Sequence, residues 1–431
     1  MTTFSDLIAS PVLRKNLASA KFVEPTPIQA QAIPPALLGL DIVATAQTGT
    51  GKTLAFSLPI IELLGRAALD KQTQSNKPQA LVLTPTRELA IQIYEAFTAI
   101  SANTGLRAAV VVGGMSEQKQ LQAIKRGVQV VIATPGRLCD FLKRRLVALD
   151  CVKIAVLDEA DRMLDMGFIP DVERILRLTA EDRQTLFFSA TFETGATAAL
   201  ISKHMKNPTR ITVGSTTKPA ENIEMHVYQV DQDRKLGLLN SLLKTQQGSF
   251  LVFARTKHGA EKLAKKLAIG GVKSTAIHGD RSQNQRNSAL KGFQDGQYRV
   301  LVATDVAARG IHVDNIAHVV NYDLPQAPED FIHRVGRTGR AGQAGVASTF
   351  ATSAERNGIR AIERTLKMTL TRRELPEGIV REDRSAAPVI EMPKRHGAYA
   401  HEANVAAKKF GNSKPSLSSF KPRRSRFAAG R

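Results

Sequence analysis

A glycine-rich octet near the amino terminus carries residue types that bind phosphate. It follows an apolar run at 42–44 and precedes an apolar segment of helical character that starts at Leu54. In this order of strand, turn and helix, backbone N–H groups and the helix N-terminus converge on an anion. The lysine is expected to reach terminal phosphates and the last threonine to hold Mg²⁺. The octet is Ala46, Gln47, Thr48, Gly49, Thr50, Gly51, Lys52 and Thr53.

One position of the octet departs from the usual G-x-x-x-x-G-K-[ST] pattern. Ala46 stands where that pattern has glycine, so the turn should differ slightly at its start. A glycine-rich loop that merely joins two elements is the alternative interpretation.

An acidic tetrapeptide at 158–161 is the second group of residues that could take part in a reaction. It follows the fully apolar run 154–157, which places Asp158 at the carboxyl end of a strand, where ligands bind to parallel sheets. We expect Asp158 to complete the Mg²⁺ site begun by Thr53, and Glu159 to orient and polarise an attacking water. The alternative is a solvated acidic turn that caps a helix.

Short apolar runs alternate with helical stretches and must position these residues. The runs lie at 42–44, 81–83, 110–112, 130–132, 154–157 and 186–188, and then at 250–253, 275–277, 300–303, 319–320 and 346–350. This alternation predicts two α/β units, each a parallel sheet flanked by helices. We assign them to 1–207 and 223–375, with a linker at 208–222 and a tail at 376–431. Because only the first unit has a Gly-Lys-Thr loop, the nucleotide should bind between the units.

The composition indicates a globular protein with a polyanionic partner. The 431 residues include 60 lysines and arginines against 39 acidic residues, a net charge of +21. Nucleic acid explains this charge best, and an anionic membrane surface is second. No apolar run approaches the ~18 residues of a membrane span, and the first residues lack a signal-peptide pattern. Membrane binding is therefore not expected.

Cysteine and aromatic usage narrow the chemistry further. Cys139 and Cys151 have neither C-x-x-C spacing nor a nearby histidine pair, so they predict neither a disulfide framework nor a zinc site. A reduced cytoplasm is the compartment that this usage favours. Aromatic residues make up 5% of the chain and tryptophan is absent, so contacts to a nucleic-acid backbone should dominate over base stacking.

Together these residues resemble the DEAD-box ATP-dependent RNA helicases, and further motifs follow that family's order from about residue 4 to 350. The resemblance implies two tandem RecA-like domains, and the run at 255–260 is most similar to the bacterial RhlE group. The further motifs are Phe22 with 25–29, then 85–90, 113–114, 134–137, 189–191, 252–256, Gln283 with Arg286, 304–310 and 333–340.

For ATP, the resemblance implies an adenine site and a set of catalytic residues. Phe22 is expected to pack on the adenine ring and Gln29 to hydrogen-bond its edge, while Asp305 and His312 belong to the same nucleotide site. Arg337 and Arg340 match arginine fingers that reach the γ-phosphate when the domains close, and such an arginine contributes ~10³–10⁵ in rate. Without the family, these arginines could equally form a surface patch. The other catalytic residues are Lys52, Asp158 and Glu159.

For RNA, the resemblance implies backbone contacts from both domains. Ser189 and Thr191, with Asp161, match the segment that couples hydrolysis to strand separation. The expected RNA-binding residues are Pro85, Thr86, Arg87, Gly113, Gly114, Thr134, Pro135, Gly136, Arg137, Arg255, Arg286 and Thr304.

His312 departs from the family pattern, which has aspartate there, next to the ATP ribose. An imidazole can hydrogen-bond a hydroxyl but lacks the two acceptor oxygens of a carboxylate. The substitution either weakens the ribose contact or is neutral.

The end of the chain is expected to be a disordered basic tail. Residues 385–431 contain ten lysines and arginines against two glutamates, with Gly, Ser and Pro interspersed, so they cannot bury enough apolar surface to fold alone. Phe410, Phe420 and Phe427 stand among these charges, a pattern that can hold RNA through phosphates and stacking. A merely solubilising tail is the alternative.

The expected function is therefore an RNA-stimulated ATPase. ATP and Mg²⁺ would bind in the interdomain cleft, and single strands or short duplexes would be held by phosphates and 2′-hydroxyls. Bending one strand would separate a duplex locally, and hydrolysis would release the RNA. A DNA-directed motor and a non-catalytic, ATP-switched RNA clamp are the rival functions. A setting in ribosome assembly or RNA decay is left open.

Overall fold

The computed structural model describes residues 2–46, 49–69, 77–190, 195–214, 222–308, 313, 316–339 and 343–382. Met1–Glu382 form one compact unit. The basic tail predicted from residue 385 onward lies outside the described residues, as do Gln47, Thr48, Thr191, His312 and Arg340.

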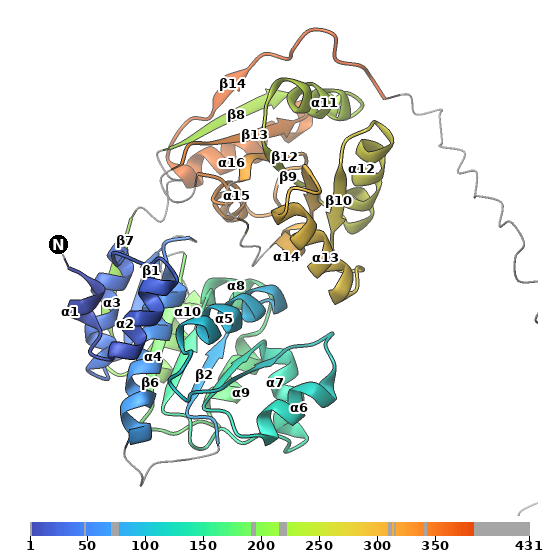
Figure 1. The fold of residues 1–431 in the computed structure, drawn as a ribbon. Helices are drawn as coiled ribbons and strands as arrows, with labels where there is room; N and C mark the ends of the chain where they lie inside the picture. The colour runs from blue at the N-terminus through green and yellow to red at the C-terminus, as the bar shows by residue number, and fades with distance from the viewer. Residues whose placement is uncertain are drawn as a thin grey trace, which may run out of the picture. The chain divides into compact units, whose positions relative to one another are not determined.

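The amino-terminal half is built on a seven-stranded sheet with the order β3-β4-β2-β5-β6-β1-β7 (Figure 1). All of its strand pairs are parallel. The strands are β1 (Ile42–Ala46), β2 (Ala80–Leu83), β3 (Ala108–Val111), β4 (Val130–Ala133), β5 (Ile154–Leu157), β6 (Gln184–Ser189) and β7 (Thr209–Val213). The helices are α1 (Phe4–Leu7), α2 (Pro11–Ser19), α3 (Pro27–Leu37), α4 (Lys52–Leu69), α5 (Arg87–Ile100), α6 (Glu117–Lys125), α7 (Pro135–Lys143), α8 (Ala160–Asp165), α9 (Ile169–Leu176) and α10 (Gly195–His204).

The carboxy-terminal half repeats this architecture with the order β10-β11-β9-β12-β13-β8-β14, again in parallel (Figure 1). Its strands are β8 (Ile223–Gln229), β9 (Ser249–Phe253), β10 (Ser274–Ile277), β11 (Val300–Ala303), β12 (Ile316–Asn321), β13 (Gly345–Ala351) and β14 (Thr371–Arg373). Its helices are α11 (Lys235–Thr245), α12 (Lys257–Ile269), α13 (Gln283–Gln294), α14 (Asp305–Ala308), α15 (Pro328–Val335) and α16 (Arg356–Leu366), with a 3₁₀ turn at Ser353–Glu355.

Both sheets are covered on both faces, which explains why their central strands are buried and largely apolar. Along β2, Val82 packs into one buried cluster, whereas Leu81 and Leu83 pack into another. Along β9, Leu251 and Phe250 likewise belong to different clusters. Because side chains alternate across a strand, this pattern places one core on each face of each sheet. The predicted fold of two parallel sheets flanked by helices is confirmed.

Two segments differ from the boundaries expected from the sequence. Strand β7, within the expected linker, pairs in parallel with β1 at the edge of the first sheet. Its residues are largely half-exposed or exposed, so the segment lacks the apolar run that marks a central strand. Residues 376–382, within the expected tail, pack on the second half: Ile379 is buried and Glu382 forms an ion pair with Lys266 at 2.8 Å.

No helix in the described part of the chain combines the length and the apolar character that crossing a membrane requires.

Candidate active site and nucleic-acid interface

A cavity of about 650 Å³ opens at the carboxyl edge of the first sheet. It brings together the adenine, phosphate and acidic residues that the sequence analysis predicted from separate motifs. Helix α5 forms an apolar wall, which sequence reasoning did not anticipate. The lining residues are Ala20, Phe22, Glu24, Thr26, Gln29, Gly49, Gly51, Lys52, Thr53, Leu54, Leu89, Gln92, Ile93, Ala96, Ala99, Ile100, Asp158 and Glu159.

The phosphate loop begins directly at the end of β1. Gly49 and Gly51 have φ values of 86° and 91°, which glycine adopts without steric cost. Lys52 starts α4 and is buried, and its Nζ donates to the Ala46 carbonyl at 3.0 Å. The ammonium group therefore lies over the loop, and Ala46 serves as the last strand residue rather than as a turn glycine.

Helix α3 supports this loop from the adenine side. The Gln29 Oε1 atom accepts from the Thr26 backbone N–H at 2.9 Å, and its Nε2 donates to the Gly51 carbonyl at 3.0 Å. The Thr26 hydroxyl donates to the Thr50 carbonyl at 2.7 Å. Phe22 is partly exposed at the cavity. Gln29 thus links the predicted adenine site to the phosphate loop.

Asp158 and Glu159 follow β5 and are each only 3% exposed. Burial raises the pKa of Asp158 to about 7, although Lys52 acts in the opposite direction. Burial also raises the pKa of Glu159, but Arg162 and then Arg337 outweigh it, so the net pKa is lowered. Glu159 has left-handed backbone angles, φ 50° and ψ 49°, at the N-cap of α8. The acidic pair therefore belongs to a buried site and is not a solvated turn.

The residues present fit a bound Mg²⁺. The Thr53 hydroxyl and the Asp158 carboxylate line the same cavity, and hard divalent cations prefer such oxygen donors. A nearby cation would also offset the burial that keeps Asp158 hard to ionise. Mg²⁺ is usually held by one or two carboxylates plus substrate phosphates.

Asp161 connects α8 to the end of β6. Its Oδ2 accepts from the Ala190 backbone N–H at 3.1 Å, and the Ser189 side chain also bonds to it. Burial raises the pKa of Asp161, but the charges of Lys52 and Arg162 and the Ser189 hydrogen bond act in the opposite direction, and the net pKa is lowered. The predicted coupling residues Asp161 and Ser189 are thus joined, whereas Thr191 lies outside the described residues.

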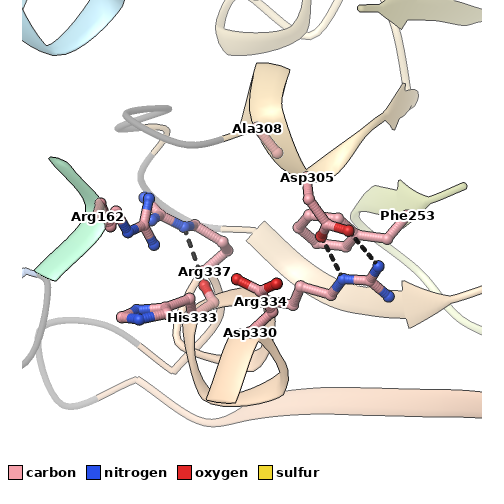
Figure 2. A pocket seen from close by; sticks show the side chains of 8 residues that line it. All are labelled: Arg162, Phe253, Asp305, Ala308, Asp330, His333, Arg334 and Arg337. Carbon is pink, nitrogen blue, oxygen red and sulfur yellow. Dashed lines mark hydrogen bonds and ion pairs between the residues drawn. The ribbon is translucent and has the colours of Figure 1, made fainter. Parts of the chain in front are cut away.

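Arg337 lies on the turn after α15 and is 2% exposed. Its Nε donates to the His333 carbonyl at 3.2 Å. Figure 2 shows both residues beside Arg162, which comes from α8. Burial, followed by the charge of Arg162, lowers the pKa of His333 to about 3, so this imidazole is neutral at physiological pH. Arg340 and His312 lie outside the described residues.

Asp305, predicted at the nucleotide site, forms a two-bond ion pair with Arg334 at 2.6 and 2.7 Å (Figure 2). Arg334 also donates to Asn321 Oδ1 at 3.1 Å and lies 4.9 Å over the Phe253 ring. Arg334 is 2% exposed. Its ion pair with Asp305 therefore joins α15 to α14 in a buried environment. No local sequence pattern indicated this role, although Arg334 lies within the motif 333–340.

A second cavity, of about 570 Å³, gathers most of the predicted RNA-binding residues. The predicted residues that line it are Pro85, Thr86, Arg87, Gly113, Thr134, Gly136, Arg137 and Arg286. The lining also includes residues that were not predicted, which are Glu88, Asp140, Met166, Phe168 and Gly279. Gly114, Pro135, Arg255 and Thr304 are not among its lining residues. Arg255 instead forms an ion pair with Glu355 at 3.0 Å.

Two of the predicted RNA-binding residues that line this cavity, Arg286 and Arg87, contact other groups of the protein. Glu88, which is 4% exposed, accepts from Gln283 Nε2 at 2.7 Å and forms an ion pair with Arg286 at 3.1 Å. The Arg87 guanidinium packs on Gly113 and Gly114, where any side chain would crowd it. The glycine pair is therefore required to seat Arg87.

Comparisons with known proteins identify the family. The DEAD/DEAH box helicase model matches residues 26–200, and the helicase conserved C-terminal domain model matches 234–342. The chain is 42% identical over 377 residues to the DEAD-box ATP-dependent RNA helicase CshA of Geobacillus kaustophilus, covering 87% of this chain and 79% of the relative. CshA of Streptococcus pneumoniae is 40% identical over 410 residues, which are 95% of this chain and 76% of the relative.

Solved structures agree with that relationship. S. cerevisiae Dbp5 bound to RNA and ADP BeF3 has a TM-score of 0.75 and 33% identity, covering 87% of this chain and 96% of that chain. Mss116p bound to ssRNA and AMP-PNP has a TM-score of 0.80 and 28% identity, covering 87% and 80%. The fold and site define a tandem RecA-like nucleotide-dependent enzyme. The chain belongs to the family of DEAD-box ATP-dependent RNA helicases.

Proposed function

We propose that this ATP-dependent RNA helicase binds ATP in the cavity around Lys52 and an RNA backbone in the cavity around Arg87. The observation that carries the proposal is the convergence of the phosphate loop, Asp158 and Glu159 in one cavity, with both carboxylates buried. A phosphate loop alone would indicate binding, whereas a buried carboxylate in addition supports hydrolysis.

Mg²⁺ would be held by the Thr53 hydroxyl and the Asp158 carboxylate, with ATP supplying further oxygens. When bound, it neutralises negative charge on the phosphates. Lys52 places a second positive charge at the same phosphates. Gln29 and Phe22 orient the adenine, so that the γ-phosphate faces Glu159.

Hydrolysis uses one water molecule and needs no other reactant. The water oxygen forms a bond to the γ-phosphorus while the bond from that phosphorus to the β,γ-bridging oxygen breaks, which gives ADP and phosphate. Glu159 orients the water and accepts its proton, which then passes to phosphate or solvent. Arg337 and Arg340 stabilise the charge that develops on the transferring group.

RNA is held mainly through its phosphates and 2′-hydroxyls. Arg87, Arg137 and Arg286 supply positive charge to one cavity, and Thr86, Thr134 and the glycines supply polar backbone or hydroxyl groups. Pro135, Gly114, Arg255 and Thr304 extend the path. A strand bent along this path leaves A-form geometry, and a paired strand is then released locally.

The domain boundaries and the cellular setting complete the proposal. We assign the ATP-binding domain to 1–207, the linker to 208–222, the second domain to 223–375 and the tail to 376–431. Within these bounds, β7 belongs to the first sheet and residues 376–382 pack on the second half. Two cysteines without disulfide or metal spacing favour the cytoplasm. Ribosome assembly and RNA decay are the candidate settings.

Glu159→Gln tests the proposal. Glutamine keeps the shape of the side chain but cannot accept the water proton, so ATP turnover should fall by at least 100-fold while RNA binding in the presence of ATP persists. RNA affinity is measured by fluorescence anisotropy and turnover by phosphate release. Turnover at the wild-type rate would contradict the role of Glu159, and an unchanged ATP-dependent function without turnover would indicate a clamp.

A further inference from the structure

Glu159 occupies a position that its own backbone does not favour. Its φ of 50° and ψ of 49° cost a non-glycine residue roughly 1–2 kcal/mol, and its carboxylate is 3% exposed. Such a conformation persists only when surrounding groups determine it. The groups packed around Glu159 must therefore stabilise this conformation.

Arg162 is the partner that the structure provides on the same helix. One turn further along α8, its Nη1 atom lies 3.4 Å from Glu159 Oε2, and its side chain is 2% exposed. Because Glu159 is the N-cap of α8 and has left-handed backbone angles, regular helical spacing does not by itself bring the two side chains together. Burying a carboxylate costs several kcal/mol unless an opposite charge compensates, and a guanidinium is always charged.

The contact is an ion pair that engages one carboxylate oxygen of Glu159. Neither Glu159 Oε2 nor Arg162 Nη1 has a hydrogen-bond partner among the described residues. A charge-assisted hydrogen bond would measure about 2.7–2.9 Å, shorter than the observed 3.4 Å. Arg162 thus attracts one carboxylate oxygen without fixing both, which leaves hydrogen-bonding capacity for a water.

The surroundings of Arg162 argue against a purely structural ion pair. Figure 2 shows its guanidinium next to His333 and Arg337, on a pocket of about 10 Å³. A second cation beside Arg337 is electrostatically costly unless nearby carboxylates offset it, and both Glu159 and Asp161 interact with the charge of Arg162. The charge cluster therefore links the orientation of the Glu159 carboxylate to the position of Arg337.

We propose that Arg162 is a positioning residue for hydrolysis, which aims the Glu159 carboxylate at the attacking water. The inference rests on the proposed role of Glu159. Displacing a reacting group by about 1 Å can cost on the order of 100-fold in rate. Arg162→Met should therefore lower kcat for RNA-stimulated ATP hydrolysis by roughly 10–100-fold, with KM for ATP and RNA affinity within twofold of the wild type.

Three further variants make the test specific. Arg162→Lys retains the charge and should recover most of the lost kcat. Arg174→Met removes an exposed ion pair of the same i,i+3 spacing on α9, to Asp171 at 3.1 Å, and should leave kcat unchanged. In a Glu159→Gln background, Arg162→Met should cause no additional loss, because the group that it positions is already gone. Thermal unfolding of each variant identifies any that fail to fold.

The outcomes separate the inference from the proposed function. Loss of turnover in Glu159→Gln with normal kcat in a folded Arg162→Met would overturn the role of Arg162 alone. Normal turnover in Glu159→Gln would overturn the role of Glu159. An equal fall in kcat and RNA affinity, a further loss in the double variant, or failure of both Arg162→Met and Arg162→Lys to fold would show that Arg162 acts through structure rather than through Glu159.

Discussion

The Arg87 guanidinium packs on Gly113 and Gly114, so a substitution at Gly114 should change both stability and RNA binding by amounts that can be estimated. Gly114 has φ of 76°, and a Cβ there would overlap the Arg87 Nη1 atom. Gly114→Ala should cost about 1–2 kcal/mol of stability because alanine disfavours this backbone region. Because the overlapping atom is the end of a flexible side chain, the guanidinium should move rather than the backbone.

Moving Arg87 should remove about one phosphate contact. Each contact contributes ~0.7 to the slope of log affinity against log salt for a single strand, so the slope should flatten by about that amount. Loss of a charged hydrogen bond of about 1.5–3 kcal/mol corresponds to roughly 10–150-fold weaker binding. The assay is RNA anisotropy with a non-hydrolysable ATP analogue at several salt concentrations, beside thermal unfolding.

Gly105→Ala is the matched control. Its φ is 78°, nearly that of Gly114, but nothing lies within 4 Å of a Cβ at this position. Both variants should lose similar stability, and only Gly114→Ala should lose RNA affinity. Equal RNA affinities and equal salt slopes for the two variants would refute the role of Arg87 in binding RNA.

Three further predictions concern ATP, the tail and pH. His312→Asp should lower the apparent KM for ATP in steady-state assays, since a carboxylate offers the ribose two acceptors; an unchanged KM would indicate a neutral substitution. Deleting 385–431 should weaken RNA affinity and flatten its salt dependence, whereas an unaltered slope would favour a solubilising tail. Burial, then His226, lowers the pKa of His318 to about 3, so the unfolded chain binds a proton below pH 6.5 that the folded chain does not. Stability should therefore fall by about 1.4 kcal/mol per pH unit from pH 6.5 towards 3, and a denaturation series with His318→Asn should show a shallower fall; identical slopes would contradict this.

The parts of the structure that sequence reasoning predicted are those with local signals. The apolar run before Asp158 indicated a buried strand, and its end therefore indicated the ligand edge. The loop before Lys52 was recognisable from glycine spacing. Strand β7 was missed because it is an edge strand whose residues are mostly half-exposed or exposed, so its sequence resembles that of a polar linker.

The parts that were missed depend on contacts between residues distant in sequence. The ion pairs of Glu88 with Arg286 and of Asp305 with Arg334 join different motifs, and no local periodicity indicates which charges will meet. Arg162 follows directly after the acidic tetrapeptide, yet only the structure places its guanidinium against Glu159. Local sequence patterns predicted the helices and strands. The pairs of oppositely charged residues could be identified only from the folded structure.

The dependence of ATP hydrolysis on RNA can be measured in a single comparison. Steady-state ATP hydrolysis by the full chain is compared without nucleic acid, with a single-stranded RNA and with DNA of the same sequence. Strong stimulation by RNA alone is the predicted result, because the site is expected to use 2′-hydroxyls as well as phosphates. Equal stimulation by DNA would support a DNA-directed motor, and absence of turnover in all three conditions would contradict RNA-dependent hydrolysis.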